Sequence, residues 1–327
     1  MYFGHSGQSA INYLANEIGK DDPHASSHWQ KYHSAFKFNG QAFEGLQGFG
    51  GNVKPPSGLR SWTLQKLQYR FRVMGKQYPL FNSVDALAHQ MTSQQNRSYD
   101  LDVLRQAITI SFLHHKAADK LSPTAMGCVI GDGFASMTAL LLASGSAGRV
   151  VLINLSKTLL VDLWYLKLWM GVTAFESSVD LVTDEASLAQ ALAKPLKEGS
   201  KQVIALQASH HALLRNCPID FAINIASMQE MDPPITAAYF HDLREVARTR
   251  ELLFYCCNRE MKQLPDGTVT QFLKYPWHTH DHILTDELCP WHQQYYSIRP
   301  PFYHSYDGAH QHRLAIFQNN NLTSSHE

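Results

Sequence analysis

The chain has 327 residues with 28 basic and 28 acidic side chains, so its formal net charge is zero, which argues against a nucleic-acid footprint or a membrane-surface patch. A hydrophobic content of 44% is enough for the core of one large domain, or of one domain with an appendage. Five cysteines without paired spacing, an N-terminus unlike a secretory signal and the lack of an apolar run long enough to cross a bilayer predict a cytoplasmic protein.

Residues 1–120 are predicted to form a mostly helical region that leads into the core of the fold. The first 60 residues are rich in Gly, Ser, His and Asn, which is typical of loops. Apolar residues at helical spacing predict helices over 61–77 and 100–120, and Asp100 or Asp102 is placed to cap the second one. We expect residues 1–60 of this region, together with the aromatic segment 275–306, to close over a ligand as a lid.

Strands and helices alternate over residues 121–320, and a polar tail of residues 321–327 follows. Strands are predicted over 127–131, 149–154, 179–183, 202–206, 221–225 and 252–257, and helices over 135–144, 156–170, 185–194 and 235–248. This alternation predicts an α/β fold with a doubly wound, mainly parallel sheet. Segments 295–298 and 313–317 predict a closing antiparallel hairpin, which the Rossmann-like class I methyltransferase fold carries.

A glycine turn separates the first predicted strand of this domain from its helix. Glycines there let the backbone approach a ligand, and the helix N-terminus offers unpaired N–H donors. The second strand ends in a polar residue at the place where nucleotide-binding folds contact ribose hydroxyls. We therefore expect an adenosine-containing ligand at Gly131, Asp132, Gly133, Phe134, Asn154 and Leu155.

Two residues near this turn bear on the identity of the ligand. A dinucleotide fingerprint requires a third small glycine where Ser136 stands, and NAD prefers an acidic residue where Asn154 stands. S-adenosylmethionine has no pyrophosphate to be cradled, so the first two glycines suffice for it. The predicted cofactor is therefore S-adenosyl-L-methionine, with a dinucleotide or a purely structural turn as the alternatives.

Polar residues follow several other predicted strands, at the edge where α/β folds bind ligands. Asp184 is placed either to meet the adenine amino group or simply to cap the next helix. Segment 224–231 either contributes to the site or is an ordinary polar loop. Within it we expect Ser227 to contact the cofactor and Glu230 to act as the base that takes a proton from an acceptor hydroxyl, with His210, His211 and His312 as the alternative bases.

The C-terminal third combines histidines with many aromatic residues. His278, His280 and His282 alternate and could share one strand face, but no spacing suggests a fourth ligand, so we expect no metal. Aromatic rings with polar neighbours suit stacking on a sugar ring. The expected substrate-binding residues are Asn258, Arg259, Tyr275 and Trp277.

Several segments resemble, in order and spacing, the bacterial sugar O-methyltransferase family. They are 224–231, Tyr239-Phe240, Phe254-Tyr255, Asn258-Arg259, Leu264-Pro265-Asp266-Gly267, Tyr275-Pro276-Trp277, Cys289-Pro290-Trp291-His292, Pro300-Pro301-Phe302 and His312-Arg313-Leu314. The resemblance covers about residues 120–317. It implies a Rossmann-like class I fold that binds S-adenosylmethionine.

The sequence thus predicts an S-adenosylmethionine-dependent O-methyltransferase acting on a sugar or another polar small molecule, with no nucleic-acid or membrane partner. Its expected catalytic residues are Glu230, Asn224 and His312. Methyl transfer is an in-line displacement, so positioning would supply most of the catalysis. The alternative is an enzyme that cyclises or eliminates the aminocarboxypropyl arm of S-adenosylmethionine and releases methylthioadenosine. An oxidoreductase and a non-catalytic protein are weaker alternatives, and the oligomeric state is open.

Overall fold

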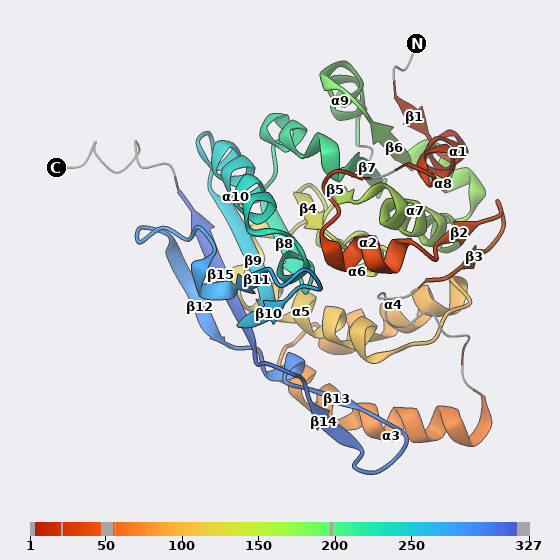
Figure 1. Cartoon of the computed structure of the whole chain (residues 1–327), viewed down its shortest axis with the longest axis vertical. Helices are drawn as coiled ribbons and strands as arrows, with labels where there is room; N and C mark the ends of the chain where they lie inside the picture. The colour runs from red at the N-terminus through yellow and green to blue at the C-terminus, as the bar shows by residue number, and fades with distance from the viewer. Residues whose placement is uncertain (1–3, 21, 47–54, 56, 197–198, 319–327) are drawn as a thin grey trace.

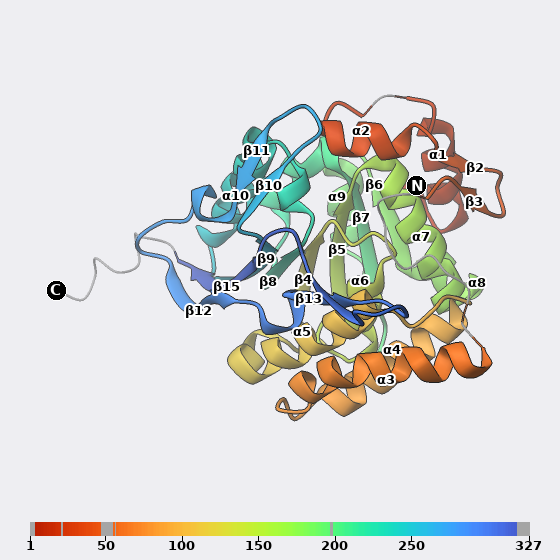
Figure 2. The ribbon, with the colours of Figure 1, turned by 60° about the horizontal axis from the view of Figure 1, so that its bottom comes forward.

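The protein has a layered α/β architecture built on one large central sheet (Figure 1). The computed structural model describes residues 4–20, 22–46, 55, 57–196 and 199–318. Helices cover the sheet on both sides, and α3 to α5 lie together beside one of its faces (Figure 2).

The central sheet has nine strands within the described residues, in the order β1-β6-β7-β5-β4-β8-β9-β15-β12. Strands β4 to β9 run parallel where they pair, whereas β15 is antiparallel to both β9 and β12, and β1 is antiparallel to β6. The bounds are β1 (His5–Ser6), β4 (Met126–Ile130), β5 (Arg149–Asn154), β6 (Val179–Val182), β7 (Gln202–Gln207), β8 (Phe221–Ile225), β9 (Leu252–Arg259), β12 (His282–Leu288) and β15 (His310–Phe317).

The strand order identifies the fold. When the seven strands from β7 to β12 are numbered among themselves in chain order, with β4 first and the edge strand β6 left out, they lie in the order 3-2-1-4-5-7-6, and the seventh, β15, is antiparallel to its neighbours. This is the sheet of the Rossmann-like class I methyltransferase fold, as the sequence predicted. Strands β6 and β1 extend the sheet beyond that core at one edge, so the N-terminal region is joined to it directly.

The helices divide between the two faces of the sheet by their packing. One face is covered by α1 (Gln8–Glu17), α3 (Gly58–Gly75), α4 (Phe81–Gln94), α5 (Leu101–Ala117), α6 (Ser136–Ala143), α7 (Ser156–Met170) and α8 (Val172–Ser178). The other is covered by α9 (Glu185–Leu192) and α10 (Pro233–Ala247). Helix α2 (Ser27–His33) follows Ala25, which packs with Leu155 and Ala208 where β5 and β7 end.

Short-range chemistry explains where several elements begin. All five residues of β4 are buried, as expected for a central parallel strand covered on both faces. The Asp100 carboxylate accepts a hydrogen bond of 3.0 Å from the Val103 N–H and caps α5. Helix α10 starts at Pro233, whose fixed φ suits the first helical turn.

The predicted closing hairpin is correct in kind but wrong in one of its strands. The partner of β15 is β12, not 295–298. Residues Gln294–Tyr296 form β13, which pairs with β14 (Tyr303–Ser305) in a separate small hairpin. The edge strand β12 escaped prediction because its residues do not alternate between apolar and polar and most of them are exposed. Further small hairpins pair β2 (Lys37–Phe38) with β3 (Phe43–Glu44) and β10 (Met261–Gln263) with β11 (Val269–Gln271).

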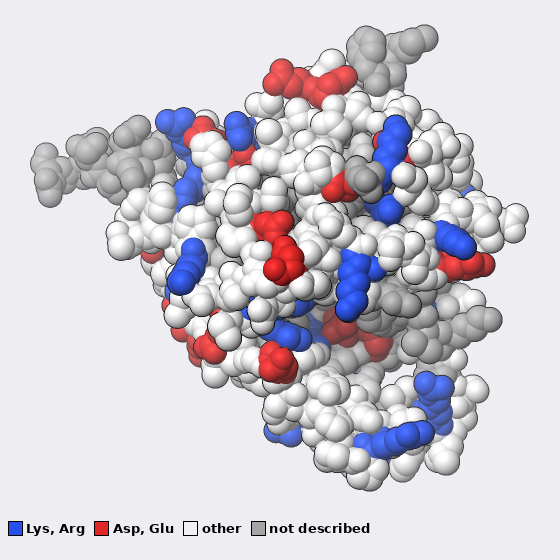
Figure 3. Space-filling model, in the orientation of Figure 1, with Lys and Arg blue, Asp and Glu red and all other residues white. Residues whose placement is uncertain are grey.

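Basic and acidic side chains are interspersed over the face shown in Figure 3, in keeping with the balanced composition. Among the described residues, no helix combines the length and the apolar character needed to cross a membrane. The predicted polar tail, 321–327, lies outside the described residues.

Candidate active site

A cavity of about 350 Å³ opens where the parallel strands of the central sheet end. One part is lined by the turn after β4, by the ends of β5 and β8, and by Ser26 and Trp29 beside and on α2. The other part lies between α5, the end of β9 and the beginning of β15, and it is rich in charged and imidazole groups. The cavity therefore reaches from the glycine turn to a polar end.

The glycine turn has the geometry of a tight approach site. Gly131 and Gly133 adopt positive φ angles of 74° and 92°, which side chains rarely allow. A Cβ atom at Gly131 would overlap the side chain of Ser227, so only glycine fits there. Ala135 is left-handed as well, with φ of 49°, and α6 starts directly after it.

Two carboxylates, of half-buried Asp132 and fully buried Asp162, fix the backbone of this turn by hydrogen bonds. Asp132 accepts hydrogen bonds of 3.0 Å and 2.7 Å from the Met137 and Thr138 N–H groups at the start of α6. Asp162 accepts one of 2.8 Å from the Ala135 N–H and another of 2.8 Å from Asn154 Nδ2. Burial, and then the nearby Asp132, raise the pKa of Asp162 well above its ordinary value. Asn154 lines the cavity, but its amide is already engaged in positioning this loop.

Arg97 brings a buried cation to the same end of the cavity. Its guanidinium donates a hydrogen bond to Ser136 Oγ at 2.5 Å and lies 4.6 Å from the centre of the Phe134 ring. The carboxylate of Asp100 is 3.8 Å away. Burial, and secondarily Asp102, raise the pKa of Asp100 to about 6. A cation and a weakly acidic carboxylate thus face the cavity together.

A network of amides connects β4, β8 and β9 beneath the cavity. Asn224 Nδ2 donates to the Ile130 carbonyl at 2.9 Å, and Asn258 Nδ2 donates to Asn224 Oδ1 at 2.9 Å. Ser227 Oγ donates to the same Ile130 carbonyl at 2.9 Å. Ser227 lines the cavity, whereas Asn224 and Asn258 are fully buried and position the loops that form it.

Glu230 lines the middle of the cavity, next to α2. Lys262 Nζ donates to one carboxylate oxygen at 2.6 Å, and His28 Nε2 lies 3.4 Å from the other. Burial raises the pKa of Glu230, but the interactions with His28 and Lys262 outweigh it, so the pKa lies below its ordinary value. Its backbone carbonyl accepts a hydrogen bond from Ser26 Oγ at 2.5 Å. Glu230 is therefore an ionised carboxylate held between two partners.

The structure brings most of the predicted cofactor residues to this cavity, with Arg259 at its polar end. The cavity is lined by Gly131, Asp132, Gly133, Phe134, Asn154, Leu155, Ser227, Glu230 and Arg259.

Other predicted site residues lie elsewhere, each for a local reason. Asp184 forms a capping box with Ser187 at the start of α9. Tyr275 and Trp277 pack in the hydrophobic core against Phe240 rather than lining the cavity. His312 is fully buried on β15, where its Nδ1 lies 3.1 Å from the Tyr255 hydroxyl. Aromatic and polar residue types alone do not reveal which side of a sheet they face.

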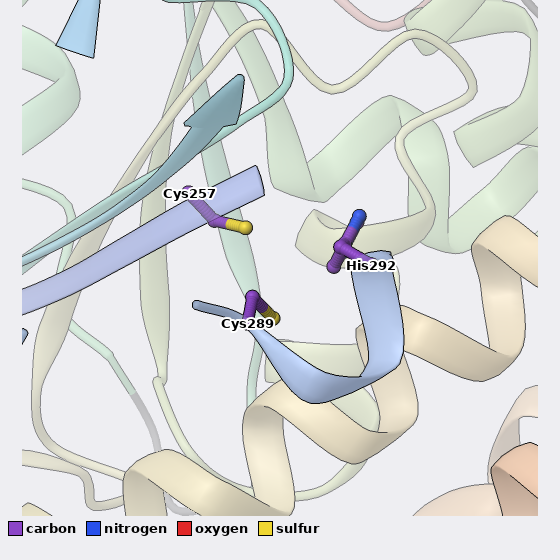
Figure 4. A group of neighbouring side chains, drawn as sticks. All are labelled: Cys257, Cys289 and His292. Carbon is purple, nitrogen blue, oxygen red and sulfur yellow. The ribbon is translucent and has the colours of Figure 1, made fainter. Parts of the chain in front are cut away.

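Two groups of possible metal ligands occur among the described residues. Cys257, Cys289 and His292 have ligand atoms within 4.8 Å of one another (Figure 4), and of the three only His292 lines the cavity. The group offers three ligand atoms among the described residues, one fewer than the four protein ligands of a structural zinc site.

The other group is His278, His280 and Asp281. Asp281 already binds Arg244 through both oxygens at 2.9 Å, and His282 belongs to β12, so the three alternating histidines do not share a strand face. We assign no metal to either group.

Several cavity residues were not predicted from the sequence. They are His24, Trp29, Arg97, Arg105, Tyr239, His292, Tyr306 and His310. Most come from the N-terminal region or from the segment before β15, far from the glycine turn along the chain. Arg97, just before the polar start of α5, was the one sequence signal for these residues, because an arginine that is buried needs partners.

No protein-family model and no curated protein sequence matches the chain. Solved structures with related architecture include magnesium protoporphyrin IX methyltransferase from Synechocystis PCC 6803, at 14% identity and a TM-score of 0.36, covering 66% of this chain and 84% of that one. The methyltransferase domain of bacterial CtHen1 has 14% identity and a TM-score of 0.34, covering 66% and 99%. A mutant of MtNAS has 9% identity and a TM-score of 0.35, covering 94% and 96%. At these values the strand order, not the superposition, identifies the fold.

Proposed function

We propose that the protein is an S-adenosylmethionine-dependent methyltransferase that acts on a hydroxyl group of a sugar or another polar small molecule. The observation that supports this most is the single cavity that joins the glycine turn to a polar, charged end. A cofactor at the turn and an acceptor at the polar end would meet within one cavity. Closing this cavity by a lid would remove water from the reacting groups.

The cofactor would extend along the ends of the strands. Trp29, Leu155 and Ala208 provide an apolar wall at β5 and β7 for the adenine, and Asn154 lies beside it for the ribose. The backbone at Gly131 and Gly133 permits close approach of the amino-acid portion, whose carboxylate would find the Arg97 guanidinium. When bound, S-adenosylmethionine supplies an electrophilic methyl group.

Glu230 is the proposed proton acceptor for the acceptor hydroxyl. Its depressed pKa guarantees the ionised form at neutral pH, which a base needs, but it also weakens the base. Lys262 would stabilise the Glu230 carboxylate before the proton is transferred and would stay hydrogen-bonded to the carboxyl group afterwards. Asn224 stays a proposed positioning residue, since it orients Ser227 and the loop after β8. The cavity does not reach His312 within the described residues, so its role would be indirect.

The products of S-adenosylmethionine provide the test. Purified protein is incubated with S-adenosylmethionine and pools of sugars, sugar acids and hydroxy acids, and the products are measured by mass spectrometry. The proposal predicts S-adenosylhomocysteine together with an acceptor heavier by one methylene unit. Methylthioadenosine would instead show attack on the aminocarboxypropyl arm and would overturn methyl transfer.

A further inference from the structure

The polar end of the cavity contains cationic and imidazole groups whose hydrogen-bonding capacity the protein itself does not use. His292 and His310 both line the cavity and are only 5% and 4% exposed. His292 Nε2 and His310 Nδ1 are each buried without a hydrogen-bond partner. Buried polar atoms normally find partners, so these two nitrogens indicate a place for a ligand.

Arg259 adds a cation that no carboxylate compensates among the described residues. Its guanidinium donates 3.1 Å to the Asp307 carbonyl, its Nε is buried without a partner, and its carbon lies 5.7 Å from the centre of the Tyr306 ring. The backbone N–H of Arg259 is fixed by Gln229 Oε1 at 2.7 Å, which holds the end of β9 in place. A fixed strand end with an unpaired guanidinium is suited to bind an anion.

Neighbouring charges are paired with each other. Arg105 donates to Asp102 at 2.8 Å, to the Tyr306 hydroxyl at 2.7 Å and to the carbonyls of Trp291 and Gln294 at 2.9 Å and 2.7 Å. Lys262 is paired with Glu230 at 2.6 Å. Arg259 therefore leaves about one unit of positive charge at this end, which matches a monoanion.

We propose that Arg259, His292 and His310 form a subsite for the carboxylate of the acceptor substrate. The acceptor is then a small carboxylic acid, such as a sugar acid or a hydroxy acid, rather than a neutral sugar. The carboxylate accepts hydrogen bonds from the Arg259 guanidinium and from one imidazole N–H group of each histidine. That the bound carboxylate belongs to the acceptor rests on the proposed function, but the binding of a carboxylate at this subsite can be measured without turnover.

The spacing of the groups supports one shared ligand. The rings of His292 and His310 are 5.6 Å apart, and the Tyr306 ring is 5.0 Å from that of His310. Arg105 fixes Tyr306 and the segment that carries His292, so the subsite is rigid before any ligand arrives. Preorganised donors lose little freedom on binding, which favours a small anion.

Acetate serves as the probe. The imidazole signals of His292 and His310 are assigned by His292→Gln and His310→Gln, and acetate is titrated into the protein with NMR detection. We expect saturable shifts of both signals, an acetate affinity reduced at least about tenfold in Arg259→Gln, and an intermediate effect in Arg259→Lys. Arg250→Gln is the control, because Arg250 pairs with Asp220 just before β8, at the end of this strand that lies away from the cavity.

Acetamide and inorganic phosphate distinguish a carboxylate subsite from a site for neutral amides or for phosphate. Acetamide has the shape of acetate without its charge and should shift neither signal. The carboxylate subsite would be overturned if acetamide bound as well as acetate, or if phosphate bound more tightly than acetate. It would also be overturned if the Arg259→Gln variant, folded by circular dichroism, bound acetate normally. Calorimetric titration with S-adenosylhomocysteine, done separately, reports on the proposed function alone, so the two failures are distinguishable.

Discussion

At the residue scale, the site is formed by side chains whose electrostatic environment is set by burial. Glu230 is held ionised between Lys262 and His28, whereas burial raises the pKa of Asp162. Asn154 was predicted from the sequence to contact the ribose. In the structure its amide N–H donates to Asp162, and its side-chain oxygen accepts a hydrogen bond from the Leu155 N–H. The sequence could name Glu230 and Asn154, but the partners of Glu230, His28 and Lys262, come from segments distant in the chain, and the role of Asp162 was not predicted.

Replacing Glu230 tests its role as base. Glu230→Gln keeps the shape of the side chain but cannot accept the proton, so we expect turnover to fall by roughly a hundredfold with the fold intact. Steady-state kinetics with an acceptor identified by mass spectrometry gives the rate. Glu245→Gln is the matched control, because Glu245 is half-buried on α10, pairs with Arg248 and does not line the cavity, so the rate should be unchanged. A Glu230→Gln variant at the wild-type rate would remove Glu230 from the mechanism.

Replacing Arg97 tests which part of the cofactor it binds. Arg97→Gln removes the cation proposed for the cofactor's carboxylate, so we expect the Kd for S-adenosylhomocysteine to rise at least about tenfold. Methylthioadenosine lacks the amino-acid portion, and its Kd should stay unchanged. Calorimetry measures both ligands, with Arg97→Lys as a second variant that retains the charge. Equal losses for the two ligands would show that Arg97 supports the pocket rather than the carboxylate.

At the scale of elements, the cavity depends on segments that the parallel sheet does not need for its own core. Helix α2 is tied to the rim, since Ser26 binds the Glu230 carbonyl and His33 Nε2 lies 3.2 Å from Thr158 Oγ1 on α7. On the other side, the 3-10 turn Pro290–His292 and the hairpin β13–β14 are held by Arg105 from α5. Of these segments, α2 is the one we expect to respond to a ligand at the glycine turn, whereas the segments held by Arg105 stay fixed.

Hydrogen exchange tests this lid function of the N-terminal region. We expect S-adenosylhomocysteine to slow amide exchange over 27–33, because α2 borders the proposed adenine pocket. Helix α3, which contributes no residue to the cavity, is the internal reference and should exchange at an unchanged rate. Exchange over α2 that is indifferent to the ligand would mean that this helix is a fixed wall and not a lid.

The sequence predicted the elements of the parallel core well and the site only in part, and it did not predict α1, α2 or β12. Strands β5 and β8 and helix α7 have the predicted bounds, because buried apolar runs and the residues that flank them are local signals. The glycine turn is local as well, and the residues expected there line the cavity. His310, in contrast, reaches the cavity only because β15 inserts antiparallel between β9 and β12, which no local pattern indicates.

At the scale of the whole molecule, stability is linked to pH through histidines buried in neutral form. Burial lowers the pKa of His33 to about 4 and that of His310 to about 3. The unfolded chain takes up protons at these side chains near pH 6.5 while the folded chain does not, so their contribution to stability is present above that pH and lost as the pH falls. Asp100 acts in the opposite direction, since its pKa is raised to about 6.

The contribution of one histidine is isolated by comparison with a variant. His33→Gln has no proton to gain, so between pH 7.5 and pH 5 it should lose about 2 kcal/mol less unfolding free energy than the wild type, at about 1.4 kcal/mol per pH unit below 6.5. Urea unfolding at both pH values measures this difference. Parallel losses in the two proteins would show that His33 titrates normally in the folded state.

The central claim is that the glycine turn holds S-adenosylmethionine, and calorimetric titration with S-adenosylhomocysteine tests it most directly. We predict saturable binding of one equivalent by the wild type and no detectable heat with NAD. Gly133→Val places a branched side chain at a φ of 92° and should abolish binding while the circular dichroism spectrum is retained. Normal binding by a folded Gly133→Val variant, or preferential binding of NAD, would contradict the account.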